Sequence, residues 1–139
     1  MITEDYVSFE TAKLLKEKGF NEPCRLYYDK YHGCVPIFVE DSKLTEYGYK
    51  ELVRNDQNSI SDFIASAPSL YVAMKWLREV HDVQIEISIV GTDTWESPTK
   101  WMYGFRCQTK DVIDRRNADF SSYEEACENG IKYCLEKLI

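Results

Sequence analysis

Apolar and polar positions recur with two different periods along the chain, and each period predicts one kind of element. Apolar residues three and four positions apart run from Pro68 to His81, which is the spacing of one helix face. Strict alternation follows from Val83 to Val90, as expected of a strand with one buried and one wet face. These two segments predict a helix that leads directly into a half-buried strand.

A second helix is predicted near the amino terminus, from Phe9 to Lys18. Ser8 can cap it by accepting a hydrogen bond from an unpaired amide of the first turn. Gly19 can take the left-handed conformation that ends a helix, with Phe20 folding back onto the last turn.

The third helix is predicted at the carboxyl terminus, from about Tyr123 to Leu138. Ser122 and Glu125 have the spacing of a capping box. Gly130 falls on the buried stripe and costs helix stability relative to alanine, by roughly 1 kcal/mol. We therefore expect Gly130 to let this helix lie close to the sheet.

Extended segments punctuated by turn residues predict two hairpins. The first hairpin has a turn over 29–33, where Gly33 can take a positive φ, and the second has its turn over 91–98. Pro36 restricts its own strand to a sheet edge. The predicted strands are 24–28, 35–39, 83–90 and 101–108, with a further short strand at 112–115.

Residues 40–66 show neither period. They combine mixed polarity with the polar run 55–59, and we expect a long loop that holds one short helix near Leu44–Arg54. A loop of this length in a compact domain is either functional or mobile, so it is the expected border of any ligand pocket.

The elements together predict an α+β fold. We expect one antiparallel sheet of four to five strands with about three helices packed on one face, in the order α-ββ-α-ββ-α. The chain of 139 residues is close to the commonest domain size, so residues 1–139 are expected to form a single domain.

Aromatic residues make up 14% of the sequence, and ten of them are tyrosines. Aromatic side chains are enriched in the cores of protein interfaces, where charged residues are depleted. One face of the strand 101–108 and the first hairpin carry several of them. The predicted interface residues are Trp101, Tyr103, Phe105, Tyr27 and Tyr28.

Charge and hydropathy restrict the partners. The formal net charge is −7 with no basic cluster, so the phosphate backbone of a nucleic acid is repelled and nucleic-acid binding is not expected. The first residues lack the pattern of a signal peptide, and no apolar run is long enough to span a membrane. We expect a cytoplasmic protein.

Candidate chemistry is sparse. Cys24, His32 and Cys34 have side chains that zinc prefers, but no fourth ligand and no zinc-site spacing accompany them. The five cysteines are an odd number, as expected of free thiols in a reducing compartment, and Cys127 and Cys134 share the apolar face of the last helix. A cysteine–histidine pair assembled only by the fold stays open as an alternative.

The acidic pairs also lack the spacing of a calcium loop. Glu124 and Glu125 fall in the first turn of the last helix, where its dipole favours negative charge. The other two pairs are Glu40 with Asp41 and Asp111 with Asp114. No catalytic residue, metal ligand set or cofactor is therefore predicted, and the chain is expected to be non-enzymatic.

Three stretches resemble a group of small uncharacterised proteins of anaerobic gut bacteria and their phages or mobile elements. They are residues 1–15, residues 73–81 (Ala-Met-Lys-Trp-Leu-Arg-Glu-Val-His) and residues 122–127 (Ser-Tyr-Glu-Glu-Ala-Cys). No activity is known for the group, so the resemblance implies a bacterial or phage context and no functional residue.

Three functions remain open on these grounds. The leading hypothesis is a non-enzymatic protein-interaction or accessory protein that binds another protein or forms a homodimer. The second is a small enzyme or ligand-binding domain with a pocket near residues 40–66. The third is a nucleic-acid-linked role, such as an acidic mimic of DNA.

Overall fold

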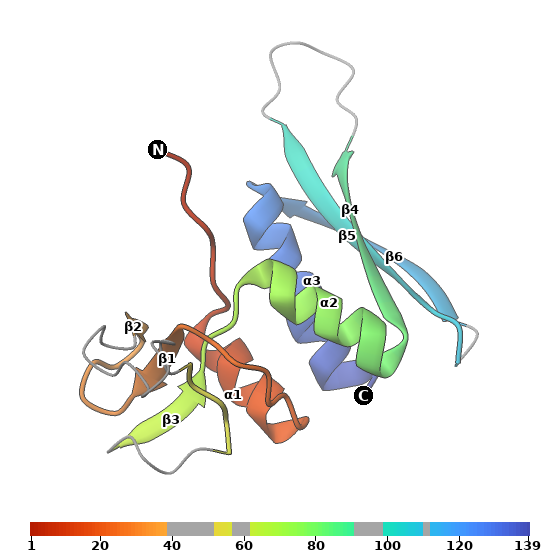
Figure 1. The fold of residues 1–139 in the computed structure, drawn as a ribbon. Coiled ribbons are helices and arrows are strands. Elements are labelled where there is room, and N and C mark those ends of the chain that lie inside the picture. The colour runs from red at the N-terminus through yellow and green to blue at the C-terminus, as the bar shows by residue number, and fades with distance from the viewer. Residues whose placement is uncertain (39–51, 57–61, 91–98, 110–111) are drawn as a thin grey trace. The chain divides into compact units, whose positions relative to one another are not determined.

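The computed structural model describes residues 1–38, 52–56, 62–90, 99–109 and 112–139. Contacts within the chain define two compact units, residues 6–69 and residues 1–5 together with 70–139. The architecture is α+β, as predicted, and the single domain stays a prediction. The elements, in chain order, are α1 (Phe9–Glu17), β1 (Leu26–Asp29), β2 (Ile37–Phe38), β3 (Phe63–Ser66), α2 (Leu70–His81), β4 (Val83–Val90), β5 (Lys100–Cys107), β6 (Val112–Phe120) and α3 (Tyr123–Lys137) (Figure 1).

The strands of the described residues form two sheets, and this corrects the prediction of one sheet with four to five strands. Each sheet has three antiparallel strands, in the orders β2-β1-β3 and β4-β5-β6. Two strands also differ from the prediction. β3 lies in the predicted loop 40–66, and its four residues are too few to show a period. β6 extends to Phe120 because pairing with β5 supports polar residues that carry no alternation of their own.

The unit of residues 6–69 places α1 beside the sheet β2-β1-β3. The predicted caps of α1 are confirmed: Ser8 Oγ accepts the Thr11 amide at 3.3 Å, and Gly19 has a φ of +92°. The Phe20 amide donates to the Leu15 carbonyl at 2.9 Å, which brings Phe20 into the core. The predicted hairpin is confirmed by the antiparallel pairing of β1 and β2.

Most of the predicted helix near Leu44–Arg54 lies outside the described residues. Residues 52–54, at its end, are not helical. Val53 instead bridges to Cys24, and each amide donates to the other residue's carbonyl at 2.8 Å. Asn55 extends this connection, since its side chain donates to the Phe20 carbonyl at 2.6 Å and accepts the Ser66 amide at 2.8 Å.

In the other unit, α2 leads into β4 through a single residue. Asp82 has a φ of +56°, and its carboxylate accepts the Thr109 amide at 3.1 Å. The left-handed conformation turns the chain sharply, and the hydrogen bond ties the start of β4 to the connection after β5. Asp is among the few residues other than glycine that tolerate this conformation.

The core of this unit lies between α2, α3 and one face of the sheet β4-β5-β6 (Figure 1). Val83 and Ile85 on that face are buried, whereas Gln84 and Glu86 on the other face are exposed. The periodicity of α2 predicts a buried face of Leu70, Ala73, Met74 and Leu77. Leu70, Ala73 and Leu77 are buried, as is Trp76, whereas Met74 is half-buried. Gly130 brings α3 against the sheet, as predicted.

Candidate functional site

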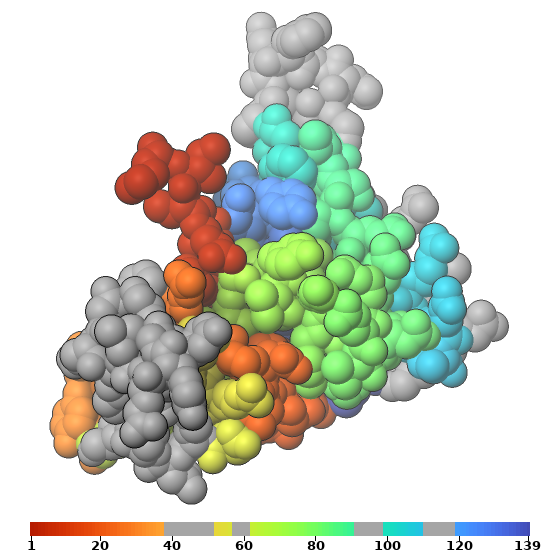
Figure 2. Space-filling view, in the orientation of Figure 1, coloured from red at the N-terminus to blue at the C-terminus, as the bar shows by residue number. Residues whose placement is uncertain are grey.

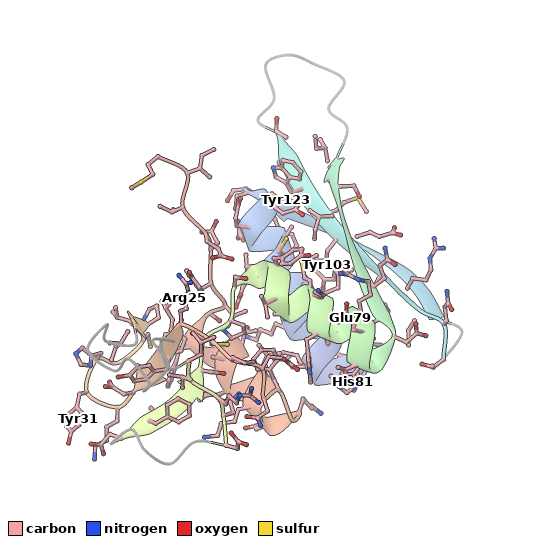
Figure 3. All side chains as sticks on the ribbon, viewed as in Figure 1. Arg25, Tyr31, Glu79, His81, Tyr103 and Tyr123 are labelled. Carbon is pink, nitrogen blue, oxygen red and sulfur yellow. The ribbon has the colours of Figure 1, made fainter. Side chains whose placement is uncertain are left out.

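The aromatic face predicted on β5 is the face that α3 covers. Register places Phe105 opposite Ile85, Tyr103 opposite Ile87 and Trp101 opposite Ile89. Tyr103 (labelled in Figure 3) and Phe105 are buried. The ring of Tyr133 from α3 lies 5.4 Å from that of Phe105. The interface prediction is corrected for these two residues, because packing beneath α3 leaves Tyr103 only 7% and Phe105 only 3% exposed.

The cover does not extend along the whole face. Exposure rises along β4 from 8% at Ile85 to 59% at Ile89, although both residues point to the same side of the sheet. At the start of α3, Tyr123 is 44% exposed and meets the half-buried Trp101 edge-on, with ring centroids 5.5 Å apart. Here an apolar strand face reaches solvent.

We call this surface the apolar end and define it by Ile87, Ile89, Trp101 and Tyr123. The end of β4, the start of β5 and the start of α3 lie together at the surface in Figure 2. Of these residues, only Trp101 was predicted as an interface residue. Two signals in the sequence point to the others: the alternation of β4 continues to Ile89, and a tyrosine follows the Ser122 cap.

The opposite face of the sheet is polar. Glu86 and Arg106 are 3.8 Å apart, and Lys100 and Asp119 are 3.3 Å apart. All four side chains are substantially exposed, so these pairs contribute little to stability.

The two tyrosines predicted in the first hairpin have different surroundings. Tyr28 is buried, and its hydroxyl donates to the Val7 carbonyl at 2.7 Å while its ring meets Phe9 edge-on. Tyr28 is therefore a core residue, which corrects its interface prediction. Tyr27 is half-buried with its ring 5.9 Å from that of Phe63, so part of its surface remains open.

The predicted metal candidates do not come together. Cys24 is buried at the bridge to Val53, and its thiol donates to the Glu22 carbonyl at 3.4 Å. His32 and Cys34 are exposed in the turn after β1. Among the residues that the structure describes, no three His, Cys, Asp or Glu side chains are grouped to hold a metal ion.

In the turn after β1, Asp29 orients His32, a pairing that the sequence analysis did not predict. The Asp29 carboxylate is buried and accepts the amides of Tyr31 at 3.0 Å and His32 at 2.9 Å. It also meets His32 Nδ1 at 2.9 Å. Because an ionised carboxylate only accepts, Nδ1 carries the proton, and Nε2 of a neutral ring is left as an acceptor. The signal was the aspartate three residues before the histidine in a turn.

The ionisable side chains of this turn lie in two pairs, Asp29 with His32 and Lys30 with Asp62. Burial by itself raises the pKa of Asp29, but the hydrogen bonds and charge of His32 outweigh it and hold that pKa below its usual range. Lys30 and Asp62 form an ion pair at 2.7 Å, and Tyr31 points away from the unit (Figure 3). The arrangement fixes the His32 imidazole in one orientation at the surface. A histidine that acts as a general base or contacts a ligand needs such a fixed orientation.

The buried cysteines are poor nucleophiles. Burial raises the pKa of Cys24 and Cys127 to about 11 and that of Cys134 to about 12. A thiol must ionise to attack, so these three are inert near neutral pH. Cys107 is also buried, which leaves Cys34 as the exposed thiol among five.

The acidic residues at the start of α3 serve the helix. Ser122 Oγ accepts the Glu125 amide at 3.0 Å, and the Glu125 carboxylate accepts the amide and hydroxyl of Ser121. Those bonds hold the pKa of Glu125 below its usual range. Glu40, Asp41 and Asp111 lie outside the described residues, as does the side chain of Asp114.

Comparison with known proteins adds no relative. No family model, curated protein or solved structure matches the chain. None of the described helices is long and apolar enough to cross a membrane.

Proposed function

We propose that residues 70–139 act as a non-enzymatic protein-binding module whose contact surface is the apolar end. The observation that carries the proposal is the exposure of Ile89, at 59%, on a strand face whose other half is buried beneath α2 and α3. Burial of apolar surface is the main favourable term in protein association. A partner that covers this end extends the core of the module.

The composition of the apolar end fits a protein contact. The rings of Trp101 and Tyr123 already pack edge-on against each other, so neither side chain loses much rotational freedom on binding. Tryptophan and tyrosine are enriched among residues that dominate binding energy. The ion pairs Glu86–Arg106 and Lys100–Asp119 lie on the opposite face of the sheet, so a partner at the apolar end does not have to desolvate these two pairs.

Site-specific photocrosslinking tests this proposal. A benzophenone amino acid replaces Ile89 in one variant and Val80 in its control. Both native side chains are 59% exposed, and Val80 lies on α2 just before the start of β4, whereas Ile89 lies near the end of β4. After irradiation in producing cells, the variant at 89 should give one defined crosslinked protein, identified by mass spectrometry, and the variant at 80 should not. Identical patterns or no crosslink at 89 would overturn the proposal.

A second candidate function is a small ligand-binding or enzymatic role for the other unit. The Asp29–His32 pair favours it, because a carboxylate that fixes an imidazole is the usual support of a catalytic or ligand-binding histidine. A ligand screen followed through the His32 imidazole resonances tests it. Ligands should shift those resonances, and the shifts should vanish in Asp29→Asn; a screen without any shift would remove this candidate.

We further propose a cytoplasmic setting in a bacterial host or in cells that carry its phage or mobile element. The resemblance of residues 1–15, 73–81 and 122–127 supports this context.

A further inference from the structure

β4 is an edge strand with regular geometry. Among the described strands it pairs only with β5, through eight consecutive residue pairs without an irregularity. The other edge, β6, has a shifted register between Trp101 and Tyr103 of its neighbour. Such a bulge twists an edge away from further pairing, whereas a regular edge leaves a row of backbone donors and acceptors available.

The two halves of β4 differ in their cover. Val83 and Ile85 lie beneath helices, but Ile87 is half-buried and Ile89 is largely exposed. A strand from another molecule that paired with β4 would run against the helices at residues 83–85. At residues 86–90 it would meet no residue that the helices cover. The accessible half is residues 86–90, with Ser88 at its centre.

We infer that the partner of the apolar end is a second copy of this chain, joined through antiparallel pairing of β4 with β4 about a two-fold axis at Ser88. This inference rests on the proposed function and names its partner. In this register Ile87 of each copy lies opposite Ile89 of the other, on the face of the apolar end. Apolar side chains that lie directly opposite each other on neighbouring strands stabilise a sheet. In this register, Ile87 of each copy covers the exposed Ile89 of the other.

Charge agrees with this register. Glu86 lies opposite Val90 of the other copy, and Ser88 lies opposite Ser88, so no like charges face each other. Lys100 pairs with Val90 in its own chain, which puts the partner's Glu86 on the same face one strand further away. A two-fold axis at Glu86 instead would set two carboxylates directly opposite, which is unfavourable. The two-fold axis gives a dimer with closed symmetry, as in most soluble homo-oligomers.

Disulfide trapping tests the register. In a Cys34→Ser background, Ser88→Cys puts two thiols opposite each other on the open face, within the Cα separation of about 4.4–6.8 Å that a disulfide needs. Gln84→Cys is the matched control, because it is an exposed position of the same face. Its two copies would be eight residues out of register, or about 27 Å apart at ~3.4 Å per residue.

Under mild oxidation, Ser88→Cys should convert to a linked dimer many times faster than Gln84→Cys. The linked dimer should keep the circular-dichroism spectrum and unfolding midpoint of the folded chain. Equal rates for the two variants, or no dimer from Ser88→Cys, would overturn self-pairing. The proposed function survives that failure if photocrosslinking at position 89 captures a different protein, and it falls if position 89 captures none.

Discussion

Gly130 of α3 lies directly against the ring of Tyr103 in β5, where a methyl group on Gly130 would approach Tyr103 Cγ to 3.2 Å. The same methyl group would be 3.2 Å from Ile85 Cγ2. Tyr103 cannot retreat easily, because its ring also stacks on Phe120 and lies near Tyr133. The missing side chain therefore sets how closely α3 covers the sheet.

Gly130→Ala should accordingly destabilise the protein. Alanine gains about 1 kcal/mol in helix propensity, but overpacking a tight core costs about 1–3 kcal/mol. We expect a net loss of about 1 kcal/mol in urea unfolding, whereas Glu136→Ala on the exposed side of α3 should change stability by less than about 0.5 kcal/mol. A Gly130→Ala variant as stable as the wild type would show that α3 has room to move.

Leu77→Ala tests the packing of α2. Leu77 is fully buried, and truncation of such a leucine costs about 2–5 kcal/mol through lost burial and the cavity it leaves. Val80→Ala on the exposed side of the same helix is the control and should change stability by less than about 0.5 kcal/mol. Equal effects in chemical denaturation would contradict the observed orientation of α2.

One thiol should react in the native protein. Cys34 is exposed, and burial that raises the pKa of Cys24, Cys127 and Cys134 to about 11–12 keeps those thiols protonated. A chromogenic thiol reagent at neutral pH should titrate one equivalent rapidly and all five after unfolding. Cys34→Ser should abolish the rapid phase. A second fast equivalent would mean that a buried cysteine is accessible.

The Asp29–His32 pair should make stability depend on pH in the acid range. The pKa of Asp29 is lower in the folded state than its usual value of about 3.9, so its contribution is complete above that value. The contribution is lost as the pH falls through the folded-state pKa. Wild type should exceed Asp29→Asn in stability at pH 6, and the difference should shrink below about pH 4. Asp56→Asn, at an exposed position, should show no such trend.

Local signals in the sequence predicted the helices well. Ser8, Gly19 and Ser122 mark helix ends through hydrogen bonds or backbone freedom that depend on a few neighbouring residues, and all three act as predicted. The close approach at Gly130 was likewise predicted, because a glycine in a buried helical stripe has few other uses. The boundaries of α1 and α3 each differ by one residue from the prediction.

Long-range pairing was harder to predict. β3 forms because residues 63–66 meet β1, more than thirty positions earlier, and nothing in four residues announces that partner. The aromatic residues of β5 show the same limit. Alternation indicated that the two faces of β5 differ, but the cover of one face by α3 depends on the fold, and so Tyr103 and Phe105 belong to the core.

Light scattering of the wild type and of Ile89→Lys at micromolar concentration tests the central claim most directly. A lysine at Ile89 puts charge into the apolar end and into the proposed strand pair, while Val80→Lys adds the same charge at an equally exposed control position. The wild type and Val80→Lys should scatter with twice the mass of one chain, and Ile89→Lys with the mass of one chain. A monomeric wild type, or a dimer that persists in Ile89→Lys, would contradict self-association through β4.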